Sequence, residues 1–296
     1  MKPFPKGLGI ALVTPFLKNG DIDFPALDAL VDHVIDGGVD YLVVLGTTAE
    51  TPALFPHERD AVLARVKTHN AGRLPVVVGI GGNNTAGVIN AIQNCDLEGV
   101  SAILSVTPFY NRPSQRGLYE HYKAIAEASP LPVILYNVPS RTSVNMLPET
   151  TLRLAREFPN IIAIKEAYGE MAQFEELLAG RPDGFSVISG DDATALPLIE
   201  RGGDGLISVA GNAFPEYISR MISEGFKGES QKAGLAWENI NDLVKCLFEE
   251  GNPTGVKAAL SIKGKIHNVL RLPLVESSES LYGRIGQLVK KSGADF

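Results

Sequence analysis

Short apolar runs alternate with amphipathic stretches along most of this chain. The runs are rich in Val, Ile and Leu and are bounded by Gly, Pro, Asn or Thr; they are GLGIALVTP at 7–15, DYLVVLG at 40–46, PVVVGIGG at 75–82, SAILSVTP at 101–108, PVILYNVP at 132–139, IIAIKEA at 161–167, FSVISGDD at 185–192 and DGLISVAG at 204–211. Apolar residues throughout a run, without alternation, are typical of parallel strands buried on both faces. The pattern therefore predicts eight parallel strands.

The segments between these runs have helical periodicity. The clearest is the apolar face formed by Leu27, Leu30, Val31, Val34 and Ile35, spaced as one side of an α-helix. Eight strands that each precede a helix-length segment indicate an α/β fold. No GxGxxG motif marks a doubly wound open sheet, so the count favours a (β/α)₈ TIM barrel over that alternative.

The strand pattern stops near residue 212. PEYISRMISEGF, GLAWENINDLVKCLFEE and TGVKAALSIKGKI follow, and all have apolar residues at helical spacing. We therefore expect a catalytic barrel over residues 1–212 and a C-terminal α-helical region over 213–296. These helices could extend the hydrophobic core or form a contact between subunits of an oligomer, and both interpretations stay open.

Composition narrows the possible functions. The chain of 296 residues has a net charge of −7 and no basic cluster, which argues against nucleic-acid binding. No apolar stretch reaches eighteen residues, so we expect no membrane span. Two cysteines without a CxxC motif, and an N-terminus without a signal-peptide pattern, fit a reducing cytoplasmic compartment.

Lys165 is the most unusual residue, because it lies inside the apolar run IIAIKEA. A charged, unpaired lysine is costly in a buried strand. Glu166 could pair with it, but neighbouring residues of a strand point to opposite faces. Burial favours the neutral amine, which attacks carbonyl carbon to form a Schiff base. The sequence thus favours a nucleophile over a structural ion pair.

Other polar groups follow strand ends, where barrel enzymes carry their chemistry. Tyr136 ends the preceding strand and could transfer protons, although a core tyrosine bonded to backbone is an equal alternative. Thr47 and Thr48 could relay a proton or simply form a polar turn. Arg141 could bind a substrate carboxylate through its guanidinium fork, or be a surface arginine.

Two other barrel chemistries are disfavoured. Metal-dependent enolisation requires acids at successive strand ends, where this chain has Asn83, Thr107 and Asn137, so no metal is expected. Asp191 and Asp192 more simply begin a helix, and they would repel a phosphate group at this position.

The motifs together resemble the dihydrodipicolinate synthases, which are pyruvate-dependent class I aldolases related to the N-acetylneuraminate lyases. The similarity covers nearly the whole chain; its motifs are GTTAET at 46–51, TPFYNRPSQRGLYEHYKAIAE at 107–127, LYNVPSRT at 135–142, IKEA at 164–167, SGDD at 189–192 and GLISV at 205–209. The resemblance implies a lyase of lysine and diaminopimelate biosynthesis. It would condense pyruvate with L-aspartate 4-semialdehyde to give 4-hydroxy-tetrahydrodipicolinate.

The resemblance also implies residue roles. Lys165 matches the Schiff-base lysine, which makes an external cofactor unnecessary, and Tyr136, Thr47 and Tyr110 match the proton relay. The tyrosine at the position of Tyr110 comes from the neighbouring subunit in that family, which implies at least a dimer and most commonly a homotetramer, a dimer of dimers. The residues that match pyruvate contacts are Thr48, Gly190 and Ile207, and Arg141 matches the arginine that receives the aldehyde's carboxylate.

Alternatives remain within and outside this family. Sialic acid lyases lack the arginine and have Ser-Thr in place of Thr47-Thr48, so this chain favours the synthase over an aldolase of a keto-deoxy sugar acid or N-acetylneuraminate. A catalytically inactive sensor barrel is a third hypothesis. The family's lysine-feedback site uses a glutamate and a histidine where this chain has Gly87 and Arg59, and the tyrosine before Tyr110 is Phe109. These departures predict weak or absent inhibition by lysine.

Overall fold

A computed structural model describes residues 6–293 and gives eight parallel strands in a closed barrel, ordered β1 to β8 along the chain. The strands are β1 (Gly7–Ala11), β2 (Tyr41–Val44), β3 (Val76–Gly79), β4 (Ala102–Val106), β5 (Val133–Asn137), β6 (Ile161–Glu166), β7 (Ser186–Ser189) and β8 (Gly205–Ser208). Nearly all of their residues are buried, as the continuous apolar runs predict. The prediction of a (β/α)₈ barrel with C-terminal helices is confirmed.

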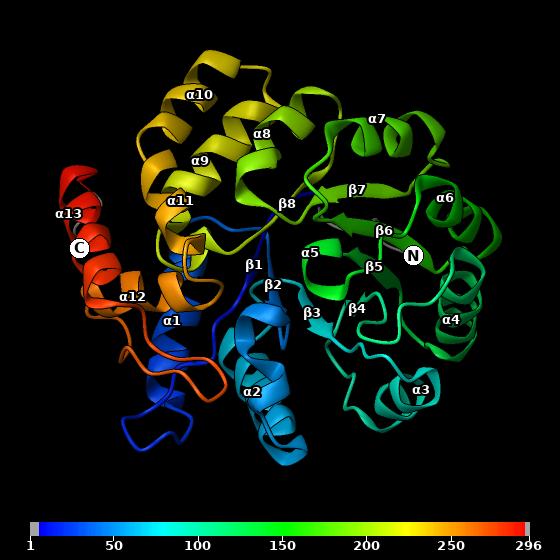
Figure 1. Cartoon of the computed structure of the whole chain (residues 1–296), viewed down its shortest axis with the longest axis horizontal. Helices are drawn as coiled ribbons and strands as arrows, with labels where there is room; N and C mark the ends of the chain where they lie inside the picture. Colours follow the sequence, from blue (N-terminus) through cyan, green and yellow to red (C-terminus); the bar gives the residue numbers. More distant parts are fainter. Residues whose placement is uncertain (1–5, 294–296) are drawn as a thin grey trace. The chain divides into compact units, whose positions relative to one another are not determined.

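Helices alternate with the strands (Figure 1). They are α1 (Phe24–Asp36), α2 (Pro56–Asn70), α3 (Thr85–Asn94), α4 (Gln115–Ala128), α5 (Pro139–Thr142), α6 (Pro148–Glu157), α7 (Met171–Gly180) and α8 (Asp192–Glu200), with 3₁₀ turns η1 (Thr47–Ala49), η2 (Thr51–Ala53) and η3 (Ala210–Asn212). The amphipathic face predicted for α1 is buried at Leu27, Leu30, Val31 and Val34. Asp191 caps α8 by accepting a hydrogen bond from the Ala193 backbone N–H, which confirms the helix-opening role of this acid pair.

Between the last strand and residue 293, where the described part of the chain ends, five more helices follow: α9 (Pro215–Phe226), α10 (Ser230–Glu238), α11 (Asn241–Phe248), α12 (Thr254–Ile262) and α13 (Glu279–Lys291). The stretch GLAWENINDLVKCLFEE, predicted as helical, is divided between α10 and α11 at Asn239 and Ile240. No helix among residues 6–293 is long and apolar enough to cross a membrane. Within the same residues, Cys95 is half-buried, Cys246 is buried and no disulfide joins them.

The chain separates into two compact units. The first contains Gly7 and Pro75–Ile207, and therefore β3 to β7 with α3 to α8. The second contains Leu8–Leu74 and the residues from Ser208 onward, so that α9 to α13 share a unit with β2, α1 and α2. The predicted boundary between barrel and helical region at residue 212 stays a prediction.

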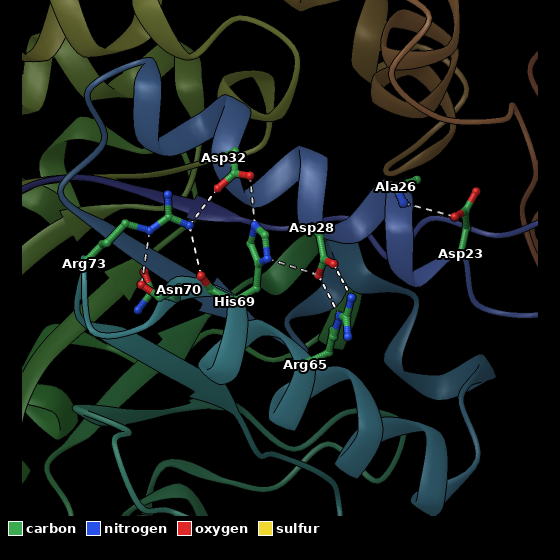
Figure 2. A network of polar contacts seen from close by, with 8 residues as sticks. All are labelled: Asp23, Ala26, Asp28, Asp32, Arg65, His69, Asn70 and Arg73. Atoms are coloured by element: carbon green, nitrogen blue, oxygen red, sulfur yellow. Dashed lines mark hydrogen bonds and ion pairs between the residues drawn. The ribbon is translucent and has the colours of Figure 1, made fainter.

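A polar network joins α1 to α2 in the second unit (Figure 2). Arg65 Nε donates to Asp28 at 2.8 Å, His69 Nε2 lies 2.9 Å from Asp32, and Arg73 donates to Asp32 at 2.7 Å. These side chains are partly exposed, and surface ion pairs each contribute little to stability. The network links the two helices and contains none of the predicted site residues.

Candidate active site

Lys165 and Tyr136 lie side by side on neighbouring strands of the first unit. They are paired in register across β5 and β6, and both are nearly buried, with 5% and 6% of their surface exposed. The Lys165 Nζ lies 4.3 Å from the centroid of the Tyr136 ring. The structure thus brings together the predicted nucleophile and the predicted proton donor.

Glu166 does not neutralise Lys165. Its carboxylate accepts hydrogen bonds from Asn137 Nδ2 at 3.0 Å, from Gln173 Nε2 at 2.8 Å and from the Tyr168 backbone N–H at 2.8 Å. Among residues 6–293, Lys165 forms no ion pair with a carboxylate. The alternation of side chains along the strand therefore separates the two residues, as expected from the sequence.

The Glu166 carboxyl itself is fully buried in a network of amides. Burial raises the pKa of Glu166 to about 7, against the lowering effect of the hydrogen bonds from Asn137 and Gln173. Asn137 also donates to Asn145 at 2.7 Å and accepts from the Met146 backbone N–H at 2.9 Å. The network therefore connects β6 to the loop that follows β5, which carries Arg141.

Arg141 lies in α5, a single helical turn directly after β5, and its side chain is exposed. The turn is fixed from within by Thr142, whose buried hydroxyl lies 3.2 Å from the Val138 carbonyl and 3.0 Å from the Val144 carbonyl. The guanidinium is thus presented by a short, internally bonded turn, consistent with the predicted carboxylate-binding role.

Gly190 leaves the space that the Lys165 side chain occupies. A Cβ at residue 190 would lie 2.8 Å from Ala167 Cβ, 3.0 Å from Lys165 Cε and 3.1 Å from Lys165 Cγ. Ile207, the other predicted pyruvate contact of this unit, is fully buried in β8. A side chain at position 190 would therefore require Ala167 or Lys165 to shift.

Tyr110 has a different environment from the other predicted site residues. Its side chain is 89% exposed, and its backbone has φ 70°, in the left-handed region that is unfavourable for a bulky residue. Asn83 Nδ2 donates to the Phe109 carbonyl at 3.1 Å, and Asn111 Nδ2 donates to the Asn83 carbonyl at 2.9 Å. These bonds hold the loop so that Tyr110 points into solvent in the single chain.

Thr47 and Thr48 belong to the second unit, where they begin η1. Thr47 is half-buried and Thr48 is 2% exposed. Asn252 Nδ2 donates to Thr48 Oγ1 at 3.0 Å, and the nearby Glu50 forms an ion pair with Lys257. Asn252 and Lys257 are not among the site residues predicted from the sequence. Lys257 carried a readable signal, because it interrupts the apolar helix TGVKAALSI as Lys165 interrupts its strand.

No group of three or more His, Cys, Asp and Glu side chains within residues 6–293 is arranged to bind a metal ion. Within the first unit, the described groups are a buried amine beside a phenol, followed by an exposed arginine after the same strand as the phenol. An amine beside a phenol is suited to imine chemistry on a carbonyl compound, which the sequence predicts for this chain.

Comparisons with known proteins show the family of this chain. The family model described as "Dihydrodipicolinate synthetase family" matches residues 5–292. A 4-hydroxy-tetrahydrodipicolinate synthase from Parabacteroides distasonis is 48% identical over 286 residues, which cover 97% of this chain and 96% of the relative. The chain therefore belongs to the dihydrodipicolinate synthetase family, and it is a lyase.

Solved structures of the family are closely similar to this chain. The dihydrodipicolinate synthase of Acinetobacter baumannii, complexed with pyruvate, has a TM-score of 0.95 at 39% identity and covers 98% of this chain and 100% of its own. The enzyme of Cyanidioschyzon merolae, with lysine bound, has a TM-score of 0.95 at 37% identity, with coverage of 99% and 100%. These relatives support the synthase interpretation of the sequence and not the sugar-acid alternative.

Proposed function

We propose that this chain condenses pyruvate with L-aspartate 4-semialdehyde to give 4-hydroxy-tetrahydrodipicolinate, in lysine and diaminopimelate biosynthesis, with Lys165 as the nucleophile. The observation that carries the residue assignment is the buried Lys165 amine beside the Tyr136 ring, without a carboxylate partner among residues 6–293. Pyruvate is the molecule bound by the Acinetobacter baumannii relative.

In the proposed reaction, the Lys165 amine attacks the ketone carbon of pyruvate, and loss of water gives an imine. Loss of a proton from the methyl group gives an enamine, whose carbon attacks the aldehyde carbon. The amino group of the semialdehyde portion then displaces Lys165 by transimination and closes the ring. The covalent imine at Lys165 performs the role that a cofactor would otherwise have.

Each proton transfer requires a group that can both donate and accept. We assign this relay to Tyr136, Thr47 and Tyr110, whose hydroxyls meet that requirement. Thr48, Gly190 and Ile207 are assigned to pyruvate, with Gly190 leaving room for the lysine side chain. Arg141 is assigned to the carboxylate of the semialdehyde, because a guanidinium pairs with a carboxylate through two parallel hydrogen bonds.

The exposure of Tyr110 supports an oligomer. A largely exposed tyrosine with a positive φ is unfavourable unless its surroundings fix it and a function requires it. In the proposal, Tyr110 enters the site of a neighbouring subunit of a cytoplasmic homotetramer, a dimer of dimers. Tyr110→Ala should then lower the activity of the oligomer, while the affinity of each chain's own site for pyruvate stays unchanged.

The substrate assignment is tested by assaying two aldehyde classes with pyruvate, aspartate 4-semialdehyde and a neutral sugar aldehyde, for the natural chain and for Arg141→Ala. We expect activity with the semialdehyde only, and an increase in its KM of about 100-fold in the variant, corresponding to roughly 3 kcal/mol for a lost charged pair. Arg220→Ala, a change of an exposed arginine in α9, is the matched control. Preference for the sugar aldehyde would contradict the proposal.

A further inference from the structure

The C-terminal region contacts the predicted pyruvate-binding segment at two buried points, one from the loop between α11 and α12 and one from α12, both within the second compact unit. The first is the hydrogen bond from Asn252 Nδ2 to Thr48 Oγ1, 3.0 Å long and spanning 204 positions of sequence. Thr48 is 2% exposed and Asn252 8% exposed. This bond is therefore shielded from water, and solvent cannot readily replace it.

The second point is Glu50, two residues after Thr48. Its carboxylate lies 2.5 Å from Lys257 Nζ, and the side chains of both residues are fully buried. The backbone N–H of Arg271 donates to Glu50 Oε2 at 2.9 Å, and Lys257 Nζ also donates to the Val269 carbonyl at 3.0 Å. Glu50 has φ 54°, a conformation that a glutamate adopts only when its surroundings hold it.

Two threonine hydroxyls form hydrogen bonds to the backbone on either side of Thr48. Thr14 Oγ1 donates to the Ala49 carbonyl at 2.8 Å, and Thr51 Oγ1 donates to the Gly46 carbonyl at 2.9 Å. The segment from Gly46 to Thr51 is thus bonded on both sides of Thr48. A change at Asn252 should therefore alter the hydroxyl of Thr48 more than the path of the backbone.

The bond from Asn252 determines what the Thr48 hydroxyl can do. A threonine hydroxyl has one O–H to donate and two lone pairs that accept. Because one lone pair accepts from the amide of Asn252, the O–H is directed away from that amide and is available to a second acceptor. The carboxylate of pyruvate only accepts hydrogen bonds, so it requires this orientation.

We propose that Asn252 is a positioning residue for pyruvate: it orients the Thr48 hydroxyl as a donor, while the Glu50–Lys257 pair holds the segment that carries it. The C-terminal helical region thereby contributes to substrate binding, in addition to the core or oligomer roles open from the sequence. This inference rests on the proposed role of Thr48 in binding pyruvate.

The test uses the full chain with Thr48→Val, Asn252→Ala and the double variant. In each, borohydride traps the imine on Lys165 over a series of pyruvate concentrations, and the KM of each substrate is measured. We expect Asn252→Ala to raise half-saturating pyruvate about tenfold, the effect of about 1.4 kcal/mol, while the aldehyde KM stays within about twofold. In the Thr48→Val background, Asn252→Ala should add less than about twofold, because the group through which it acts is absent.

Asn252→Asp keeps the volume of the side chain. It tests the same hydrogen bond if the alanine variant does not fold. Its carboxylate would accept the O–H of Thr48 and turn the donor away from pyruvate, so half-saturating pyruvate should rise by more than tenfold. Asn239→Ala, at an exposed asparagine after α10, is the control and should leave all constants unchanged.

The outcomes separate this inference from the proposed function. If the natural chain traps no pyruvate on Lys165, the proposed function fails. If the natural chain traps pyruvate and either folded Asn252 variant has the same half-saturating concentration, the positioning role alone is overturned. Full additivity of Asn252→Ala and Thr48→Val would also overturn it, because independent structural damage adds and action through Thr48 does not.

Discussion

The Lys165 amine lies 4.3 Å from the centre of the Tyr136 ring, and the two residues are partners in the parallel pairing of β6 with β5. The strand pairing thus places the proposed nucleophile beside a phenol without any contribution from a loop. Pairing of rigid strands holds two groups more precisely than loops can. We expect this relationship to persist in variants that disturb only the loops.

Tyr136→Phe should separate chemistry from packing. The variant keeps the ring beside Lys165 and removes only the hydroxyl that we assign to proton transfer. We expect a fall in kcat of about 10²- to 10⁴-fold, the usual effect of losing a general acid or base, with a melting temperature close to that of the natural chain. Steady-state kinetics and thermal unfolding measure both quantities, and an unchanged kcat would remove Tyr136 from the relay.

Gly190→Ala should displace the side chain of Lys165 by steric contact, without removing any functional group. The added Cβ would lie 2.8 Å from Ala167 Cβ and 3.0 Å from Lys165 Cε, so the lysine or the backbone must shift. We expect a loss of activity of at least about 100-fold, as misplacement by about 1 Å produces in oriented reactions. Gly234→Ala is a matched control, because a Cβ at that position meets nothing within 4 Å. Full activity in Gly190→Ala would show that the site has more room than these distances allow.

Glu166→Gln should change how stability depends on pH. Because burial raises the Glu166 pKa to about 7 from an ordinary value near 4.5, the folded chain binds more protons than the unfolded chain between these values. Stability should therefore decrease as pH rises from 4.5 to 7, by up to about 3 kcal/mol from this group. Glutamine at this position removes the decrease. Urea unfolding at a series of pH values, compared with the natural chain, measures the difference; identical pH profiles would contradict the assigned pKa.

Lysine should inhibit this chain weakly or not at all. A relative has been solved with lysine bound, but Gly87 provides no carboxylate and Arg59 brings a positive charge at the two positions that match the family's feedback site. In addition, Arg59 Nε donates to the Leu54 carbonyl at 3.1 Å. Titration with L-lysine up to millimolar concentrations should leave the rate nearly unchanged. Strong inhibition in that range would mean that the chain binds lysine through other residues.

Much of the fold could be predicted from the sequence because buried parallel strands produce uninterrupted apolar runs. The run beginning near residue 161 coincides with β6, and Lys165 stands out within it for the same reason. The division of the helical stretch after residue 234 into α10 and α11 could not be predicted, because helical spacing continues across Asn239 and Ile240. Tertiary packing, and not local propensity, determines where that helix ends.

The buried residues around Thr48, namely Asn252, Glu50 and Lys257, were harder to predict from the sequence. Nothing in the local sequence connects Asn252 to Thr48, since the bond between them spans 204 positions. Lys257 lies between apolar residues and Glu50 lies in a polar turn, and a pair of buried charges can be recognised only when the fold brings them together. The sequence therefore predicted the side chains proposed to react with substrate or to bind it, and the structure added Asn252, which donates a hydrogen bond to one of them.

The role of Lys165 can be tested by borohydride trapping of the natural chain with pyruvate, followed by peptide mass mapping. We predict a single pyruvate-derived adduct on Lys165, and no adduct when Lys165→Arg replaces the amine by a guanidinium. Lys263→Arg, a change in the C-terminal region, should trap as well as the natural chain. Absence of an adduct, or an adduct on another lysine, would contradict the central claim that Lys165 forms the imine.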